Sequence, residues 1–209
     1  MRALPTARPG RRMAVIRTAT LLATLLLMSL STVAAADASS LELQTVLAST
    51  TVTPPARVGF HEQRHNPLLE VPLVLTGYLE YLEAGVLRKA IETPFQEALL
   101  VNTDHIVIER QGETRKLSLN KSRSLKTILG AIEAILAGEA DKLAAVFDYE
   151  LSGTAGSWSV KLTPISRRIA RQLTSLQVYG DDESVTSIRV DLKDGEWHQM
   201  DILRDDPEQ

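Results

Sequence analysis

The stretch VPLVLTGYLEY, residues 71–81, places an apolar side chain or a glycine at every second position. Successive side chains of a β-strand point to opposite faces, so this spacing predicts one long strand with an apolar face. The residues that share the apolar face are Val71, Leu73, Leu75, Gly77, Leu79 and Tyr81. Such an apolar face must be covered by other parts of the chain.

Turn-forming residues recur at short intervals around this strand. They lie at 66–67, 84–85, 93–94, 102–104 and 111–112. The segments between them have the length of strands: 86–92, 96–101, 105–110 and 114–119. Short consecutive strands joined by tight turns predict an antiparallel meander, and the natural twist of sheets predicts that it curls.

A helical period replaces the period of two after residue 122. Its apolar stripe consists of Leu125, Ile128, Leu129, Ile132 and Leu136, widened by Ala131 and Ile135. Ser122 or Ser124 is suited to cap its start, and Gly138 to end it. A second short helix is expected with Ala140, Leu143, Ala144 and Phe147 on one side, and a weak amphipathic helix is expected within 37–51.

Strands return after Phe147. Trp158, Val160 and Leu162 alternate with polar residues in a strand that Pro164 ends. Residues 165–173 are expected to form one or two helical turns. The closing strands are expected at 176–180, 185–192 and 196–203, so the chain belongs to the α+β class.

The first 36 residues have the layout of a secretory signal. Five arginines precede an apolar run at 19–30, and small residues follow at 34–36. The run is shorter than the roughly 20 residues that span a bilayer. We therefore expect a cleaved signal peptide at 1–36, export to the periplasm, and one domain at 37–209.

The charge after residue 36 limits the partners. That part holds 18 basic and 26 acidic residues, a net charge of about −8. This balance argues against nucleic acid and disfavours unspecific adhesion to anionic lipid. There is no cysteine, and a chain of this length can bury a core without disulfides.

The string HEQRH, residues 61–65, matches the H-E-x-x-H motif of zinc peptidases. Both histidines can bind one zinc only on a helix, where positions four apart are neighbours. Pro54, Pro55 and Gly59 precede the motif and Pro67 follows it, which favours a strand. We therefore expect Phe60 to face inward, Glu62 and Arg64 to lie among polar neighbours, and no metal to be bound.

The sequence gives even less evidence for other kinds of active site than for a zinc peptidase. There is no cysteine nucleophile and no phosphate-binding glycine loop, and the glycines near Ser152 indicate a hairpin turn. The acidic turn at 181–183 is the only further place where a cation could bind. We expect no enzyme activity and no cofactor.

Several segments of the chain resemble the LolA-like family, which comprises periplasmic carriers of outer-membrane lipoproteins and their relatives. The likeness is carried by 60–64, 72–81, 91–94 with Glu97, 136–138 with Phe147, 158–164, 176–180 and 194–196. It is strongest toward the divergent branch associated with export of aryl polyene pigments. The order and spacing of these segments carry the resemblance more than any one of them.

The resemblance implies an unclosed antiparallel β-barrel with helices covering the open side. A cavity between them would hold acyl chains, and an ordinary dry core is the alternative. The predicted lining residues are Leu73, Leu75, Leu79, Tyr81, Ile128, Leu129, Ile132, Leu136, Trp158, Val160 and Leu162. The turn at 83–87 lacks the arginine with which the family's carriers hold their helical lid closed.

The resemblance further implies a non-catalytic carrier that passes a lipoprotein, lipid or polyene-lipid from an inner-membrane donor to an outer-membrane acceptor, and we expect it to be a monomer. An envelope sensor or adaptor that binds a protein partner is the alternative from another class. A zinc hydrolase acting through HEQRH is the third and most distant reading.

Overall fold

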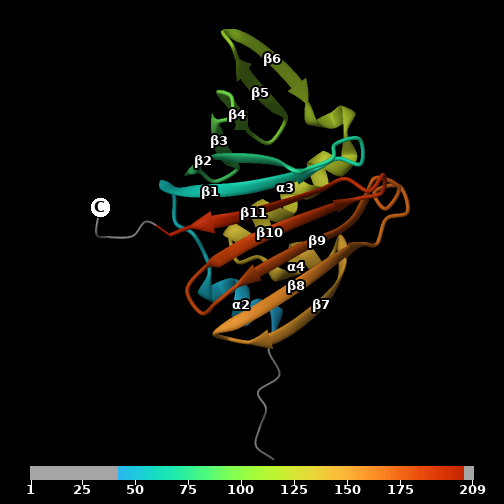
Figure 1. The fold of residues 1–209 in the computed structure, drawn as a ribbon. Coiled ribbons are helices and arrows are strands. Elements are labelled where there is room, and N and C mark those ends of the chain that lie inside the picture. Colours follow the sequence, from blue (N-terminus) through green and yellow to red (C-terminus); the bar gives the residue numbers. More distant parts are fainter. Residues whose placement is uncertain (1–41, 205–209) are drawn as a thin grey trace, which may run out of the picture. The chain divides into compact units, whose positions relative to one another are not determined.

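The computed structural model describes residues 42–204, and a single sheet runs through them (Figure 1). All eleven strands of this sheet pair antiparallel with their neighbours. The strands are β1 (Ala56–His65), β2 (Leu73–Glu83), β3 (Val86–Thr93), β4 (Glu97–Val101), β5 (His105–Arg110), β6 (Glu113–Ser118), β7 (Phe147–Thr154), β8 (Ser157–Pro164), β9 (Leu173–Gly180), β10 (Val185–Leu192) and β11 (Trp197–Leu203).

The strand order shows why the barrel stays open. It runs β6-β5-β4-β3-β2-β1-β11-β10-β9-β8-β7, so the first strand and the last pair at the centre. The free edges belong to β6 and β7, which are consecutive in the chain but lie at opposite ends of the sheet. The helical segment between them connects the two edges, and the sheet is therefore an unclosed antiparallel barrel, as predicted.

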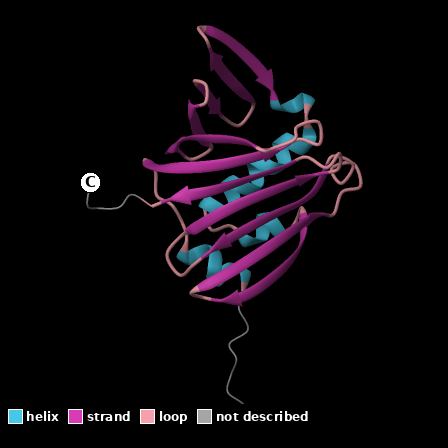
Figure 2. Cartoon of the chain, in the orientation of Figure 1, coloured by secondary structure: helices cyan, strands magenta, loops and turns pink. Residues whose placement is uncertain are grey.

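The helices lie on one side of the curved sheet (Figure 2). They are α2 (Leu43–Ser49), the 3₁₀ turn η1 (Leu119–Lys121), α3 (Arg123–Leu136) and α4 (Ala140–Ala144). The Ser122 hydroxyl accepts a hydrogen bond of 3.4 Å from the backbone N–H of Leu125 and so caps α3. Gly138 follows the end of α3. Its φ of +70° is the left-handed conformation that glycine adopts without strain.

Successive side chains of each strand point alternately to an inner face, which is turned toward the helices, and to an outer face. Phe60, Leu75 and Val160 are fully buried on the inner face. The larger core cluster joins the three α-helices to β7, β8 and β9 around Leu162, Leu176 and Val178. A smaller cluster of Phe60, Leu75 and Ile91 lies where β1, β2 and β3 pair.

One sequence-based boundary was wrong. The second helix ends at Ala144, and Phe147 instead begins β7, where it is buried against the helices. Residues 165–172 form turns, as expected, with helical-type bonds from Ala170 N–H to the Ser166 carbonyl oxygen over 2.9 Å and from Leu173 N–H to that of Ile169 over 3.0 Å. The remaining elements lie within a few residues of their predicted positions, and the predicted signal peptide lies outside the described residues.

Candidate functional site

Burial of the inner face changes across the sheet. Over β8 and β9, Val160, Leu162, Leu176 and Val178 are completely enclosed. Over β2 to β5 the coverage is uneven: Leu75, Tyr81, Ile91 and Ile106 are buried, whereas the other inner-face apolar side chains are only partly covered. Those that are half-buried include Leu73, Leu79, Leu87, Leu99, Val101 and Ile108. The inner face is therefore a dry core on one side and a partly accessible apolar surface on the other.

The helix α3 shows the same division between its two apolar sides. Ala131, Ala134 and Ile135 are buried in the larger core cluster, against which Ile128 packs. A second apolar stripe of α3 stays half-buried and consists of Leu125, Leu129, Ile132 and Leu136. Glu133, which neighbours this stripe, lies beside Gly85 at the β2–β3 turn. The stripe therefore faces the half of the molecule in which the sheet is incompletely covered.

The structure divides the predicted lining residues among three environments. Trp158, Val160 and Leu162 belong to the larger core cluster, and Ile128 packs against it. Leu75 belongs to the smaller cluster, with Leu73 and Leu79 packed against it. Tyr81 is buried, while the half-buried stripe of α3 contains Leu129, Ile132 and Leu136. The assignment of these residues to a lipid cavity remains a prediction.

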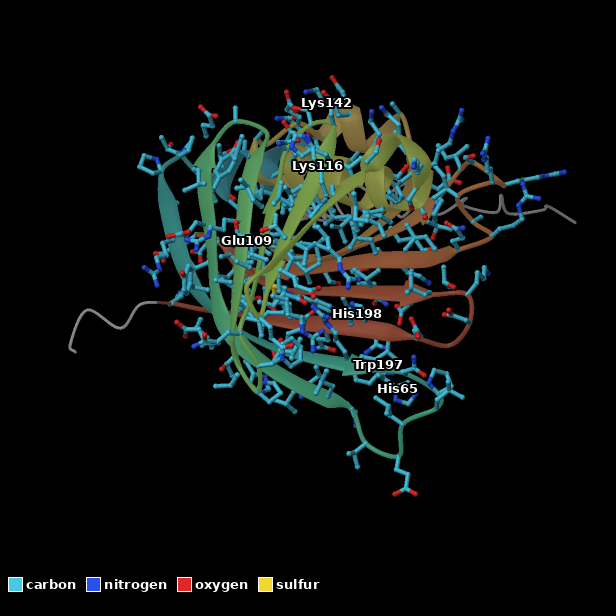
Figure 3. All side chains as sticks on the ribbon, turned by 90° about the horizontal axis from the view of Figure 1, so that it is seen from above. His65, Glu109, Lys116, Lys142, Trp197 and His198 are labelled. Atoms are coloured by element: carbon cyan, nitrogen blue, oxygen red, sulfur yellow. The ribbon has the colours of Figure 1, made fainter. Side chains whose placement is uncertain are left out.

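A group of charged side chains lies on the inner face beside the smaller cluster. We call Glu62, Arg64, Lys89 and His198 the Glu62 cluster. The Glu62 carboxylate is almost completely buried and pairs with the Lys89 ammonium. Arg64 donates from Nε and Nη2 to the two Glu62 oxygens over 3.1 and 3.2 Å. His198 Nδ1 lies 3.9 Å from Glu62 Oε1, and Figure 3 labels His198 on the inner side of β11.

The electrostatics of the Glu62 cluster follow from burial and mutual charge. Burial raises the pKa of Glu62, but Lys89 and Arg64 outweigh this effect and hold that pKa below its ordinary value. Burial lowers the pKa of Lys89 to about 8, with only partial compensation from Glu62. Burial and the charge of Arg64 also lower the pKa of His198. With Lys89 protonated and His198 neutral, the cluster carries one net positive charge.

The Glu62 cluster was not predicted from the sequence. Glu62 and Arg64 were expected among polar neighbours, but Glu62 lies on the face of Phe60 and is 2% exposed. The period of two did contain the signal, because residues 60, 62 and 64 of one strand share a face. Lys89 could be placed opposite them only once the register of β1, β2 and β3 was known.

HEQRH lies on β1, as expected, and therefore cannot form the helical site of a zinc peptidase. His61 and His65 share the outer face of the strand, where a spacing of four residues corresponds to about 13 Å. Among residues 42–204, no three histidine, aspartate or glutamate side chains converge as a metal site requires.

A polar hollow is lined by residues of β4, β5 and β6. It has a volume of about 420 Å³ and is lined by Glu97, Ile108, Arg110, Gln111, Glu113 and Arg115. Arg110 pairs with Glu97 at 3.7 Å and lies 4.4 Å above the ring of Phe95. Because its charges are paired and solvent-exposed, this hollow forms the polar rim of the apolar inner face and offers no catalytic arrangement.

The described residues thus form an open, curved antiparallel sheet with helices on its inner side and a partly accessible apolar surface. The family model described as outer membrane lipoprotein carrier protein LolA-like matches residues 35–204. The chain therefore belongs to the LolA-like family. A comparison with curated proteins found no match.

Solved structures of similar fold include a LolA-superfamily protein from Nitrosomonas europaea, with 12% identity and a TM-score of 0.40 over 79% of this chain and 93% of that one. Lipoprotein LppX from Mycobacterium tuberculosis is 10% identical, with a TM-score of 0.41 over 77% of this chain and 92% of that one. LprF from Mycobacterium bovis is 13% identical, with a TM-score of 0.32 over 77% and 90%. The family assignment rests on the family model alone.

Membership in this family fits a carrier role. None of the described helices combines the length and the apolar character needed to cross a bilayer.

Proposed function

We propose that the protein carries the acyl chain of a lipid or lipoprotein between the inner face of β2–β5 and the second stripe of α3. The observation that supports this most is the half-burial of apolar side chains that point toward the helices. A closed core would enclose Leu99, Ile132 and Leu136 as completely as it encloses Leu162. Their partial exposure leaves apolar surface that an acyl chain can cover.

The energetics suit a carrier that must release its load. Each CH₂ removed from water contributes roughly 0.8 kcal/mol, so a dozen contribute on the order of 10 kcal/mol. Association itself costs about 4–15 kcal/mol, which leaves a modest net affinity. A half-covered groove therefore permits both loading and release, whereas a deep closed cavity would retain its ligand.

The position of the Glu62 cluster suggests how the load is oriented. The cluster carries a net positive charge within the inner face, where Lys89 lies between Leu79 and Leu99 of the neighbouring strands. A polar or anionic head group would be better accommodated there than among the leucines of β2–β5. We therefore place the acyl tail along α3 and the head group toward the Glu62 cluster.

The same proposal includes the location of the protein, its donor and acceptor, and its cargo. The expected signal peptide directs the protein to the periplasm, where water separates two membranes. The cargo would be received from an inner-membrane donor and delivered to an outer-membrane acceptor. Its class is a lipoprotein, a lipid or an aryl polyene conjugate, and the protein would act as a monomer.

The test combines native mass spectrometry with uptake of a fluorescent fatty acid. Protein purified gently from periplasm should carry an excess mass that resolves into lipid, and the purified chain should bind the probe. The double variant Leu129→Gln, Ile132→Gln should lose most of the uptake while its thermal unfolding stays cooperative. The matched control is Leu82→Gln, because Leu82 is an exposed leucine on the outer face of β2.

A bare polypeptide mass together with no probe uptake would refute the carrier proposal. Equal uptake by the double variant and the control would place the bound chain elsewhere. Tight capture of a single envelope protein without any lipid would instead identify the sensor or adaptor that the sequence left as the alternative.

A further inference from the structure

Four segments meet at one end of the central strands, on the right-hand side of Figure 1. We call residues 66–72, 121–126, 165–172 and 193–196 the docking end. Asn66 donates to Glu196, and the Lys193 N–H donates to the Gln172 carbonyl oxygen over 2.9 Å. Ser124 at the start of α3 donates to Gln172. These bonds hold the four segments together as one surface.

The β1–β2 loop of the docking end exposes large apolar side chains. Leu68 is 92% exposed, Val71 72% and Leu69 49%. The loop has a defined shape, because Asn66 accepts hydrogen bonds from the backbone N–H groups of Leu68 and Leu69 over 2.9 and 2.8 Å. Ile165 in the β8–β9 segment is a fourth exposed apolar residue. The apolar side chains therefore lie on a hydrogen-bonded turn, with Leu68 and Val71 mostly exposed among the described residues.

An aromatic pair stands at the base of this loop. The rings of His65 and Trp197 stack with centroids 5.5 Å apart, and Figure 3 labels them side by side. Arg189 lies 4.5 Å above the Trp197 ring. Tryptophan next to a polar partner is typical of the water–lipid interface, where one side of the ring is apolar and the other is hydrated.

The charge of the docking end is opposite to that of the chain. It contains seven basic residues, all exposed: Lys121, Arg123, Lys126, Arg167, Arg168, Arg171 and Lys193. It contains only three acidic ones, namely Glu70, Asp194 and Glu196. Within residues 42–204, none of the seven forms an ion pair. A basic surface is thus present at the docking end although the chain as a whole is negatively charged.

We propose that the docking end binds an anionic phospholipid surface, with the β1–β2 loop inserted among the lipids. Basic side chains spread over four segments suit a diffuse layer of negative head groups. Separate apolar side chains on an exposed loop suit a fluid interface, which does not require a groove of matching shape. The inference does not require that the protein carries lipid, because vesicle binding and probe uptake are measured separately.

Vesicle flotation tests the proposal. The purified protein should float with vesicles that contain phosphatidylglycerol and not with pure phosphatidylcholine, and salt should weaken the binding because it screens charge. The triple variant Arg167→Gln, Arg168→Gln, Arg171→Gln should bind about tenfold more weakly or worse, and with less salt dependence. The variant Leu68→Ser, Val71→Ser should also lose about tenfold.

Two control variants lie outside the docking end. Leu82→Ser removes an exposed leucine at the opposite end of β2, and Lys116→Gln removes an exposed charge on β6. Both should bind vesicles like the unchanged protein, and all variants should keep their circular dichroism. Equal binding of the docking-end variants and the controls would refute the proposal.

The experiment also distinguishes binding to lipid from binding to a membrane protein. If protein-free vesicles are not bound, while membranes with their proteins are bound and the docking-end variants lose that binding, the surface recognises a protein and the proposal is wrong. Binding to vesicles without any uptake of the fatty acid would support the docking end and refute the carrier function.

Discussion

Loss of the Glu62 charge should lower the free energy of unfolding substantially. Glu62 is nearly buried between Lys89 and Arg64, so Glu62→Gln leaves a buried ammonium without its counter-charge. Removing one partner of a buried ion pair costs about 3–5 kcal/mol, and we expect a loss in this range. Urea unfolding of the two proteins measures it.

Glu113→Gln is the control for this substitution. Glu113 also pairs with an arginine, Arg115, at 3.3 Å, but both side chains are mostly exposed. Its loss should change the free energy of unfolding by less than about 1 kcal/mol. A similar small effect at Glu62 would contradict the burial described above.

Lys89 should make stability depend on alkaline pH. Its pKa is about 8 in the folded protein and 10.5 without the protein environment. Between these values the unfolded chain retains a proton that the folded chain has released. The free energy of unfolding therefore contains a contribution that rises with pH from about 8 to 10.5.

The measurement compares urea unfolding across this range for the unchanged protein and Lys89→Met. The variant should lack the rising contribution, whereas Lys116→Met, at an exposed lysine, should retain it. Parallel curves for the unchanged protein and Lys89→Met would show that the ammonium is better solvated than its burial indicates.

Gly180 has no room for a side chain. A Cβ atom at this position would lie 2.7 Å from the Ser184 carbonyl oxygen and closer still to the indole of Trp158. Trp158 is itself held by a hydrogen bond of 2.7 Å from Nε1 to the Asp181 carbonyl oxygen. Gly180→Ala should destabilise the protein by about 1–3 kcal/mol, and thermal unfolding with Trp fluorescence should report it.

At the scale of elements, α3 offers a stabilising change. Gly130 lies within this helix, and a Cβ atom there would meet nothing within 4 Å. Gly130→Ala should therefore stabilise the protein by roughly 0.5–1 kcal/mol, because alanine loses less backbone freedom in a helix. A lower midpoint of urea unfolding would show that the space beside α3 is occupied.

Local sequence patterns predicted most of the helices and strands correctly. The period of two placed β2 to β6 correctly, and the apolar stripe with its Ser122 cap placed α3, because both depend on neighbouring residues. Phe147, in contrast, was wrongly assigned to a helix. There the pattern is short, and packing of Phe147 against the helices decides the conformation.

At the scale of the whole molecule, stability should be uneven across the sheet. β6 is exposed along its entire length, whereas β8 and β9 contribute fully buried residues to the larger core cluster. Backbone amides of β5 and β6 should therefore exchange with deuterium through local opening, much faster than those of β8 and β9. Uniform protection over both regions would contradict this division.

The sequence by itself determined the class of the fold, most strands, the capped helix α3 and the absence of a helical zinc motif. These follow from spacing along the chain, which local backbone geometry controls. The tertiary structure alone decided which apolar residues are dry core and which stay half-open, and it assembled the Glu62 cluster and the docking end. Those features join residues far apart in the chain, and their proximity depends on strand register and on the curvature of the sheet.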